Sequence, residues 1–197
     1  MFTTKRNLLL ATCLFLSLGL FAQIEIEKVY AGAGLGFTKL TGDIGEGGSG
    51  GLTYFVDGAV YLMPKLAVGV EGNFNLHGYK DANDDLKFRS AGLYLAKAEY
   101  YFMDNNFSPF AGLGLGVANI QRPEVTQIDA NGNETVILEE KNKFNLGVSP
   151  RVGFVAGGFH MEFIYNLAGK EPSIEGFETF NYNFWTLSLG YRYIFEL

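Results

Sequence analysis

Residues 185–197 read WTLSLGYRYIFEL, and their side chains alternate between two characters. The odd-numbered positions are all apolar or aromatic: Trp185, Leu187, Leu189, Tyr191, Tyr193, Phe195 and Leu197. The even-numbered positions are mostly small or polar: Thr186, Ser188, Gly190, Arg192 and Glu196. A period of two is typical of a β-strand whose two faces meet different surroundings. The end of the chain is therefore predicted to form a strand with one apolar and one polar face.

The same alternation recurs in seven segments upstream, which gives eight predicted strands in all. These segments lie near 29–38, 54–62, 66–76, 93–102, 111–117, 144–154 and 160–167. The connections between them alternate in length: long ones near 39–51, 77–87, 118–142 and 168–181, short ones at 63–65, 103–106 and 156–158. Long loops at one end and brief turns at the other are typical of transmembrane β-barrels, whose short turns face the periplasm.

Aromatic residues mark both ends of the predicted strands. Phe74, Phe144, Tyr165 and Trp185 lie towards the long loops, and Phe102, Phe154, Phe159, Tyr193 and Phe195 lie towards the short turns. Such girdles indicate two membrane interfaces. A soluble, lipocalin-like barrel is the alternative, but its polar surface would leave no place for the apolar stripes. In lipid the exposed apolar stripes carry no free-energy penalty, and closure of the barrel gives every backbone N–H and C=O group of the strands a hydrogen-bond partner. The predicted fold is therefore all-β, an eight-stranded antiparallel up-and-down transmembrane β-barrel.

Charged residues on the polar faces are predicted to fill the lumen. An eight-stranded barrel is only just wide enough for side chains to fill its interior. The expected lumen network comprises Glu71, Lys97, Glu99, Arg151, His160, Glu162 and Arg192. Inward glycines on the first and fifth strands should leave room for these long side chains. Because unpaired charges buried there would cost several kcal/mol each, we expect carboxylates and cations to pair.

The first 22 residues are predicted to be a cleaved signal peptide, which leaves a barrel domain at 23–197. Lys5 and Arg6 form a positive start, 7–21 is an apolar stretch of about 15 residues, too short to span a membrane, and Ala22 supplies a small residue for cleavage. Cys13 is the single cysteine, and the apolar run continues beyond it, so lipidation is not expected. If Cys13 is removed with the signal peptide, the mature chain contains no cysteine. Disulfides, cysteine–zinc clusters and cysteine nucleophiles are then excluded.

The composition limits the classes of molecule that the chain is expected to bind. Without Lys5 and Arg6, 13 basic residues face 21 acidic ones, a net charge near −8 that argues against nucleic acid as a partner. Neither a cofactor nor a metal is predicted. Residues 81–85 (DANDD) begin like a calcium loop, but Leu86 stands where that loop needs glycine. The alternating glycines at 32–36 precede no helix, so a structural role is favoured over phosphate binding.

A catalytic site is not expected either. Ser149 and His160 form the one pair that resembles a nucleophile and its base, but both belong to inward faces, away from lipid. His160 is interpreted instead as a core histidine hydrogen-bonded to Glu162 or Arg151. His77 is interpreted as a loop-edge residue with no evident partner.

A proline in mid-strand and an Asn-Gly pair in a long connection each predict a local structure. Pro150 falls in mid-strand on the lipid face, where it supplies no N–H to the ladder, so we expect a bulge or a widened hydrogen-bond gap. Asn131-Gly132 lies between two β-prone runs, 125–128 and 135–138, and favours a two-residue hairpin turn. The fifth and sixth strands should therefore continue above the membrane as a hairpin with exposed edges.

In these features the chain resembles the OmpA, OmpX and OmpW type of small outer-membrane barrel. The resemblance covers the whole mature chain and rests on the signal peptide, the alternating glycines at 112–116 and the closing GYRYIF at 190–195. It implies localisation in the outer membrane of a Gram-negative-type bacterium and contact with lipid and lipopolysaccharide. It also implies insertion by the outer-membrane barrel assembly machinery, which usually reads a terminal phenylalanine; this chain ends Phe195-Glu196-Leu197.

For function, the expectation is a structural or surface-interaction role, with a surface ligand bound through the long loops. An OmpW-like conduit for small apolar solutes is the alternative, and the two differ in whether the lumen is filled.

Overall fold

The computed structural model describes residues 26, 28–41, 48–80, 86–122, 125–128, 134–138, 141–170 and 181–197. The predicted signal peptide and the 81–85 loop lie outside them. The strands are β1 (Lys28–Thr41), β2 (Gly48–Met63), β3 (Leu66–Lys80), β4 (Leu86–Tyr101), β5 (Phe107–Arg122), β6 (Val125–Ile128), β7 (Glu134–Leu138), β8 (Lys141–Ala156), β9 (Phe159–Lys170) and β10 (Asn181–Glu196). In this part of the chain no helix has the length and apolarity needed to cross a membrane.

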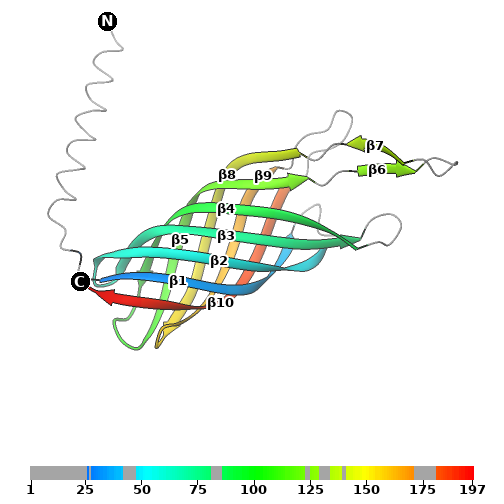
Figure 1. Ribbon diagram of the computed structural model, residues 1–197. Helices are drawn as coiled ribbons and strands as arrows, with labels where there is room; N and C mark the ends of the chain where they lie inside the picture. Colours follow the sequence, from blue (N-terminus) through cyan, green and yellow to red (C-terminus); the bar gives the residue numbers. More distant parts are fainter. Residues whose placement is uncertain are drawn as a thin grey trace, which may run out of the picture.

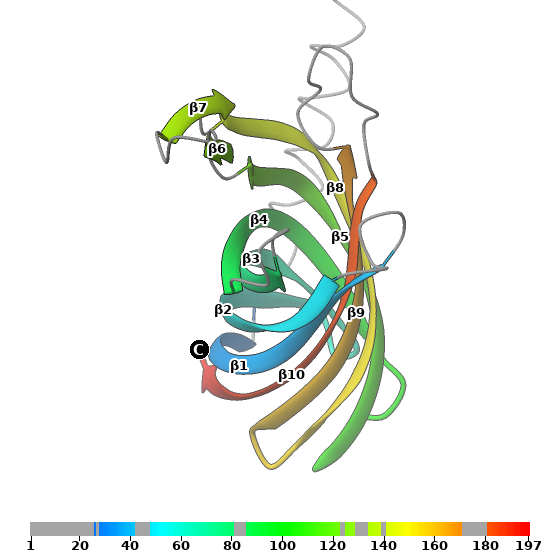
Figure 2. The ribbon, with the colours of Figure 1, turned by 90° about the vertical axis from the view of Figure 1, so that its right-hand side faces the viewer.

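Eight of these strands form a closed antiparallel barrel, as predicted (Figure 1). Its order is β1-β10-β9-β8-β5-β4-β3-β2, and β1 closes the ring by pairing with both β10 and β2. The β1–β10 ladder runs without interruption from Lys28–Glu196 to Thr41–Asn183. Every barrel strand therefore has two neighbours, so the ring offers no free edge along its length. Figure 2 shows the strands curving around the enclosed interior.

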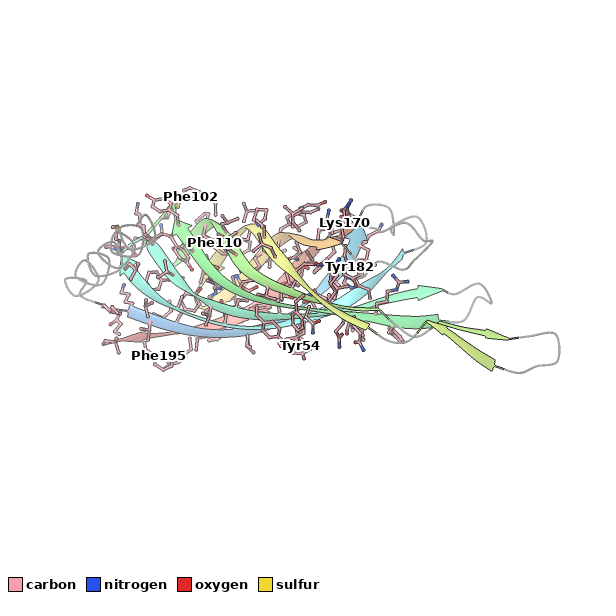
Figure 3. The ribbon with its side chains drawn as sticks, turned by 90° about the horizontal axis from the view of Figure 1, so that it is seen from above. Tyr54, Phe102, Phe110, Lys170, Tyr182 and Phe195 are labelled. Carbon is pink, nitrogen blue, oxygen red and sulfur yellow. The ribbon has the colours of Figure 1, made fainter. Side chains whose placement is uncertain are left out.

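The two faces of each strand divide as the alternation predicts. Large apolar side chains such as Leu35, Leu146 and Leu189 point outwards and are exposed, whereas inward side chains of the same strands, such as Thr38, Ser149 and Ser188, are buried. In Figure 3, Phe102 and Phe195 lie towards one end of the barrel, and Lys170 and Tyr182 lie towards the other. We call these the turn end and the loop end, after the connections found there.

The strands reach further at the loop end than the sequence pattern indicates. The ranges 39–51, 77–87, 118–142 and 168–181 were expected to be long loops, but pairing between neighbouring strands continues into each of them. The β3–β4 ladder, for example, runs to Lys80–Leu86. Once two strands are in register, each further residue adds backbone hydrogen bonds whatever its side-chain pattern, so the end of alternation does not mark the end of the strand.

The predicted hairpin is present as β6 and β7, which pair antiparallel as a separate two-stranded sheet. Figure 1 shows this sheet beyond the loop end of the barrel. The Asn131-Gly132 turn itself lies outside the described residues. At the turn end, Gly157 and Gly158 join β8 to β9 with φ angles of 58° and 87°, a left-handed pair that glycine adopts without strain.

Pro150 produces a gap rather than a bulge. The β8–β9 ladder passes from Val148–Leu167 to Arg151–Ile164 with no paired residues between them and no shift of register. On the other side of β8, Pro150 is paired with Leu113 of β5 in an unbroken ladder. The missing N–H thus weakens one seam of the barrel, and the expected widened gap is the correct alternative.

Candidate functional site: the charged lumen

The structure places all seven charged or histidine side chains of the predicted lumen set inside the barrel, each at most 4% exposed. They come from β3 (Glu71), β4 (Lys97 and Glu99), β8 (Arg151), β9 (His160 and Glu162) and β10 (Arg192). Asp57 of β2 joins them and is buried as well. It was not in the predicted set, although the alternation already put it on the inward face of its strand.

Arg192 is the most completely engaged cation. Its guanidinium binds Glu99 through both carboxylate oxygens at 2.9 Å, donates to Asp57 Oδ2 at 3.1 Å and donates to the Tyr101 hydroxyl at 2.8 Å. The guanidinium carbon also lies 4.6 Å from the centre of the Tyr30 ring. This bidentate geometry is the arrangement in which an arginine–carboxylate pair is strongest.

Lys97 and Arg151 connect the remaining carboxylates. The Lys97 ammonium bonds to Asp57, to Glu99 at 3.1 Å and to Glu71 at 3.4 Å. Arg151 bonds to both oxygens of Glu71, one of them at 3.2 Å, and reaches Glu162 at 3.4 Å. Since the contacts cross between β2, β3, β4, β8, β9 and β10, the network ties opposite walls of the barrel together.

Glycines make the room for these side chains. A Cβ at Gly114 would lie 3.0 Å from Leu95 Cδ1 and 3.1 Å from Arg151 Nη2, so both side chains would have to shift to make room for it. Likewise a Cβ at Gly32 would overlap the Asp57 carboxylate and lie 2.9 Å from Arg192 Cγ. Gly32 of β1 and Gly114 of β5 therefore stand where the long cationic side chains pass.

His160 does not make the hydrogen bonds expected of it. Its Nε2 lies 3.5 Å from Glu162 Oε2, within ion-pair distance, but neither ring nitrogen has a hydrogen-bond partner among the described residues. The ring packs between Phe110, stacked at 5.6 Å, and Phe55, edge-on at 5.6 Å. Aromatic packing and charge, rather than hydrogen bonds, therefore surround this imidazole.

A hydrogen-bonded polar layer adjoins the charges on the loop-end side. Ser149 donates to Asn166, which donates to Thr186, which donates to Thr38. Thr38 contacts His77 Nε2 at 3.1 Å, and the Tyr182 hydroxyl contacts His77 Nδ1 at 3.1 Å. The interpretation of His77 as a partnerless loop-edge residue is therefore wrong. The strands extend past it, and both of its nitrogens are engaged.

Two apolar layers enclose the polar ones. The loop-end apolar layer consists of Leu40, Ala91, Leu93, Leu95, Ala118, Ile120, Ala168, Tyr182 and Phe184. The turn-end apolar layer consists of Tyr30, Ala59, Ala67, Tyr101, Phe110 and Val155, with Tyr61 packed against it. A recess of about 840 Å³ opens at the turn end, and its lining includes Tyr61, Tyr101 and Val155 of that layer but none of the charged network. The recess therefore ends at the turn-end apolar layer.

The arrangement offers no pair suited to nucleophilic chemistry at Ser149. Its hydroxyl donates to Asn166 Oδ1 at 2.7 Å and not to His160, whose ring nitrogens have no hydrogen-bond partner among the described residues. The described residues also hold no group of three or more His, Cys, Asp or Glu side chains placed to bind a metal ion.

Comparison with known proteins agrees with this architecture. Residues 8–193 match the family model described as the outer membrane protein beta-barrel domain. No curated protein matches the sequence. Among solved structures, Neisserial surface protein A (NspA) is similar with a TM-score of 0.56 and 17% identity over 83% of this chain and 95% of its own.

Two further barrels are similar at lower scores. Ail, the attachment invasion locus protein of Yersinia pestis, was solved with the heparin analogue sucrose octasulfate and gives a TM-score of 0.44, with 17% identity over 86% of this chain and 100% of its own. The outer membrane enzyme PagL gives 0.37, with 15% identity over 83% and 97%. The family model spans nearly the whole sequence, and the closed barrel with its apolar exterior is the fold that the family name describes. This chain therefore belongs to the outer membrane protein beta-barrel domain family and resides in the outer membrane.

Proposed function

We propose that this protein is a closed barrel that acts as a membrane-embedded scaffold and presents its loop end to the cell surface. In this role the lumen network is a structural plug, and interactions with other molecules occur on the outside of the barrel. Lipid and lipopolysaccharide contact the apolar exterior, and a surface ligand is bound through the long connections and the β6–β7 hairpin.

The proposal rests on a lumen that is filled by buried side chains from the turn-end apolar layer to the loop-end apolar layer. The turn-end apolar layer meets the charged network where Tyr30 and Tyr101 donate to Glu99. The loop-end apolar layer meets the charged network where Leu95 is paired with Glu71, and it meets the polar layer where Phe184 is paired with Asn166. A water column would have to break bidentate ion pairs such as Arg192–Glu99 and also separate packed apolar side chains. Both steps are costly in a low-dielectric interior.

The alternative of a conduit for small apolar solutes is less favoured. Such a solute would enter the turn-end recess and then meet a layer of seven charged side chains before reaching the other apolar layer. A catalytic role is less favoured as well, because Ser149 and His160 are engaged separately. Insertion by the barrel assembly machinery is expected of any such barrel.

Planar-bilayer recording tests the proposal. The purified wild-type barrel should give no stable, reproducible single-channel currents, whereas Arg192→Ala, which loosens the plug, should give intermittent ones. A difference in migration between unboiled and boiled samples on SDS gels provides the control that both proteins are folded barrels. Reproducible wild-type steps of constant amplitude would show an open lumen and would favour the conduit.

A further inference from the structure

The buried network contains more carboxylates than permanent cations. Asp57, Glu71, Glu99 and Glu162 are four carboxylates, and Lys97, Arg151 and Arg192 are three cations, all of them buried. If every carboxyl is ionised and His160 is neutral, the cluster carries one uncompensated negative charge. A net charge enclosed by apolar layers is strongly disfavoured, so the network is expected to acquire a compensating proton.

The contacts locate the uncompensated charge at Glu162. Asp57, Glu71 and Glu99 each bind two or more cationic groups or a bidentate guanidinium. Among the described residues of the other strands, Arg151 at 3.4 Å is the one cationic contact of Glu162, and that arginine already binds both oxygens of Glu71. The Oε1 atom of Glu162 has no hydrogen-bond partner among the described residues.

We infer that the imidazole of His160 holds this proton and serves as the fourth cation of the lumen network. Its Nε2 lies 3.5 Å from Glu162 Oε2, two residues away on the inward face of β9. The flanking rings of Phe55 and Phe110 place aromatic π-systems beside the imidazolium, a favourable surrounding for a buried cation. The network then contains four negative and four positive groups.

The charged groups on all strands around His160 contribute to the same charge balance. Besides Glu162 of β9, they are Asp57 of β2, Glu71 of β3, Lys97 and Glu99 of β4, Arg151 of β8 and Arg192 of β10. Because Lys97, Arg151 and Arg192 are held by the other three carboxylates, loss of the His160 proton would leave Glu162 with its single long contact to Arg151. The proton is thus part of the structure that closes the lumen.

His77, the other histidine of the chain, is a matched internal control. Thr38 donates its single hydroxyl proton to the Trp185 carbonyl at 3.2 Å, so it can only accept from His77 Nε2. The Tyr182 hydroxyl can then donate to Nδ1. Neither partner is a carboxylate, so no anion at hydrogen-bond distance favours a second proton on His77, and we expect a neutral imidazole with its proton on Nε2.

The test is nitrogen-15 NMR of the two imidazoles in the folded barrel in lipid nanodiscs at neutral pH, with the signals assigned by His160→Phe. We expect both ring nitrogens of His160 to be protonated and His77 to have one protonated and one bare nitrogen. In Glu162→Gln, His160 should lose one ring proton while His77 is unchanged. A neutral His160 in the wild type would overturn the inference, whether or not the variant folds.

A second measurement compares unfolding equilibria. His160→Phe leaves Glu162 uncompensated, and His160→Phe with Glu162→Gln removes the excess charge as well. The single variant should have an unfolding constant about tenfold or more above that of the double variant. Equal constants would contradict the assignment. These readouts report charge, not conductance, so they can fail while the proposed closed barrel stands.

Discussion

Arg192→Ala is the substitution that most directly tests the lumen network. It removes the guanidinium that binds both oxygens of Glu99, one oxygen of Asp57 and the Tyr101 hydroxyl. It also leaves a space where the arginine packed beside the Tyr30 ring. Because Arg192 is 2% exposed, water cannot simply replace these contacts.

The size of the effect follows from what Glu99 retains. Breaking a buried ion pair by removing one partner costs about 3–5 kcal/mol. Glu99 keeps Lys97 at 3.1 Å and two phenol donors, Tyr30 at 2.9 Å and Tyr101 at 3.0 Å, so the lower half of that range is expected. A loss of about 3 kcal/mol corresponds to roughly a hundredfold increase in the unfolding constant.

Urea unfolding in detergent or liposomes measures this loss. Trp185, the single tryptophan, lies on β10 between Phe37 and Phe163 and reports the folded barrel by its fluorescence. The matched control is Lys170→Ala, which removes an equal charge from an exposed site at the loop end and should change stability by less than about 0.5 kcal/mol. If both variants were equally stable, the network would not be a stabilising plug.

Three further outcomes are expected. Gly32→Ala should lower the yield of folded barrel on unboiled gels because its Cβ would overlap Asp57, whereas Gly92→Ala on the lipid face, with its nearest neighbour at 3.6 Å, should fold normally. Hydrogen exchange should be faster for the β9 amides opposite Pro150 than for those paired with Val152, and equal protection would contradict the gap in the β8–β9 ladder. An epitope inserted at Asn131-Gly132 should be labelled on intact cells, since the β6–β7 hairpin extends from the loop end, and labelling only after permeabilisation would mean that the barrel has the inverse orientation.

Alternation was sufficient to predict the barrel because each residue of a membrane-spanning strand faces either lipid or lumen. The WTLSLGYRYIFEL segment shows this, since Leu189 and Tyr191 are exposed and Ser188 and Arg192 are buried. The same rule places Lys97 and Arg151 in the lumen without any knowledge of the strand order. The lengths of the strands were less predictable, because backbone pairing beyond the membrane does not require alternation.

What the pattern did not predict is the layering of the lumen along its axis. Leu93 and Leu95 lie on the same inward face of β4 as Lys97 and Glu99, but they are buried with Phe184 in an apolar layer. His77 appeared to stand alone because its partners, Thr38 and Tyr182, are 39 and 105 residues away in sequence. Which inward residues share a level depends on the shear of the ring, and a period-two pattern contains no information about shear.

The layering explains how the buried ion pairs can hold the lumen closed. An ion pair exposed to water contributes little, because solvent screens the charges and competes for their hydrogen bonds. Here the turn-end apolar layer separates the network from the recess that reaches it from one end, and the polar and loop-end apolar layers separate it from the other. Within this enclosure the Coulomb attraction is strong, but any unpaired charge is equally costly.

A smaller side chain in an apolar layer should therefore weaken the ion pairs although no charged residue is replaced. Phe110→Ala is such a change, because the Phe110 ring packs against His160 and Arg192. The check is a double-mutant cycle: the coupling energy between Glu99 and Arg192 should be smaller in the Phe110→Ala background, and an unchanged coupling energy would show that the layers do not insulate the network.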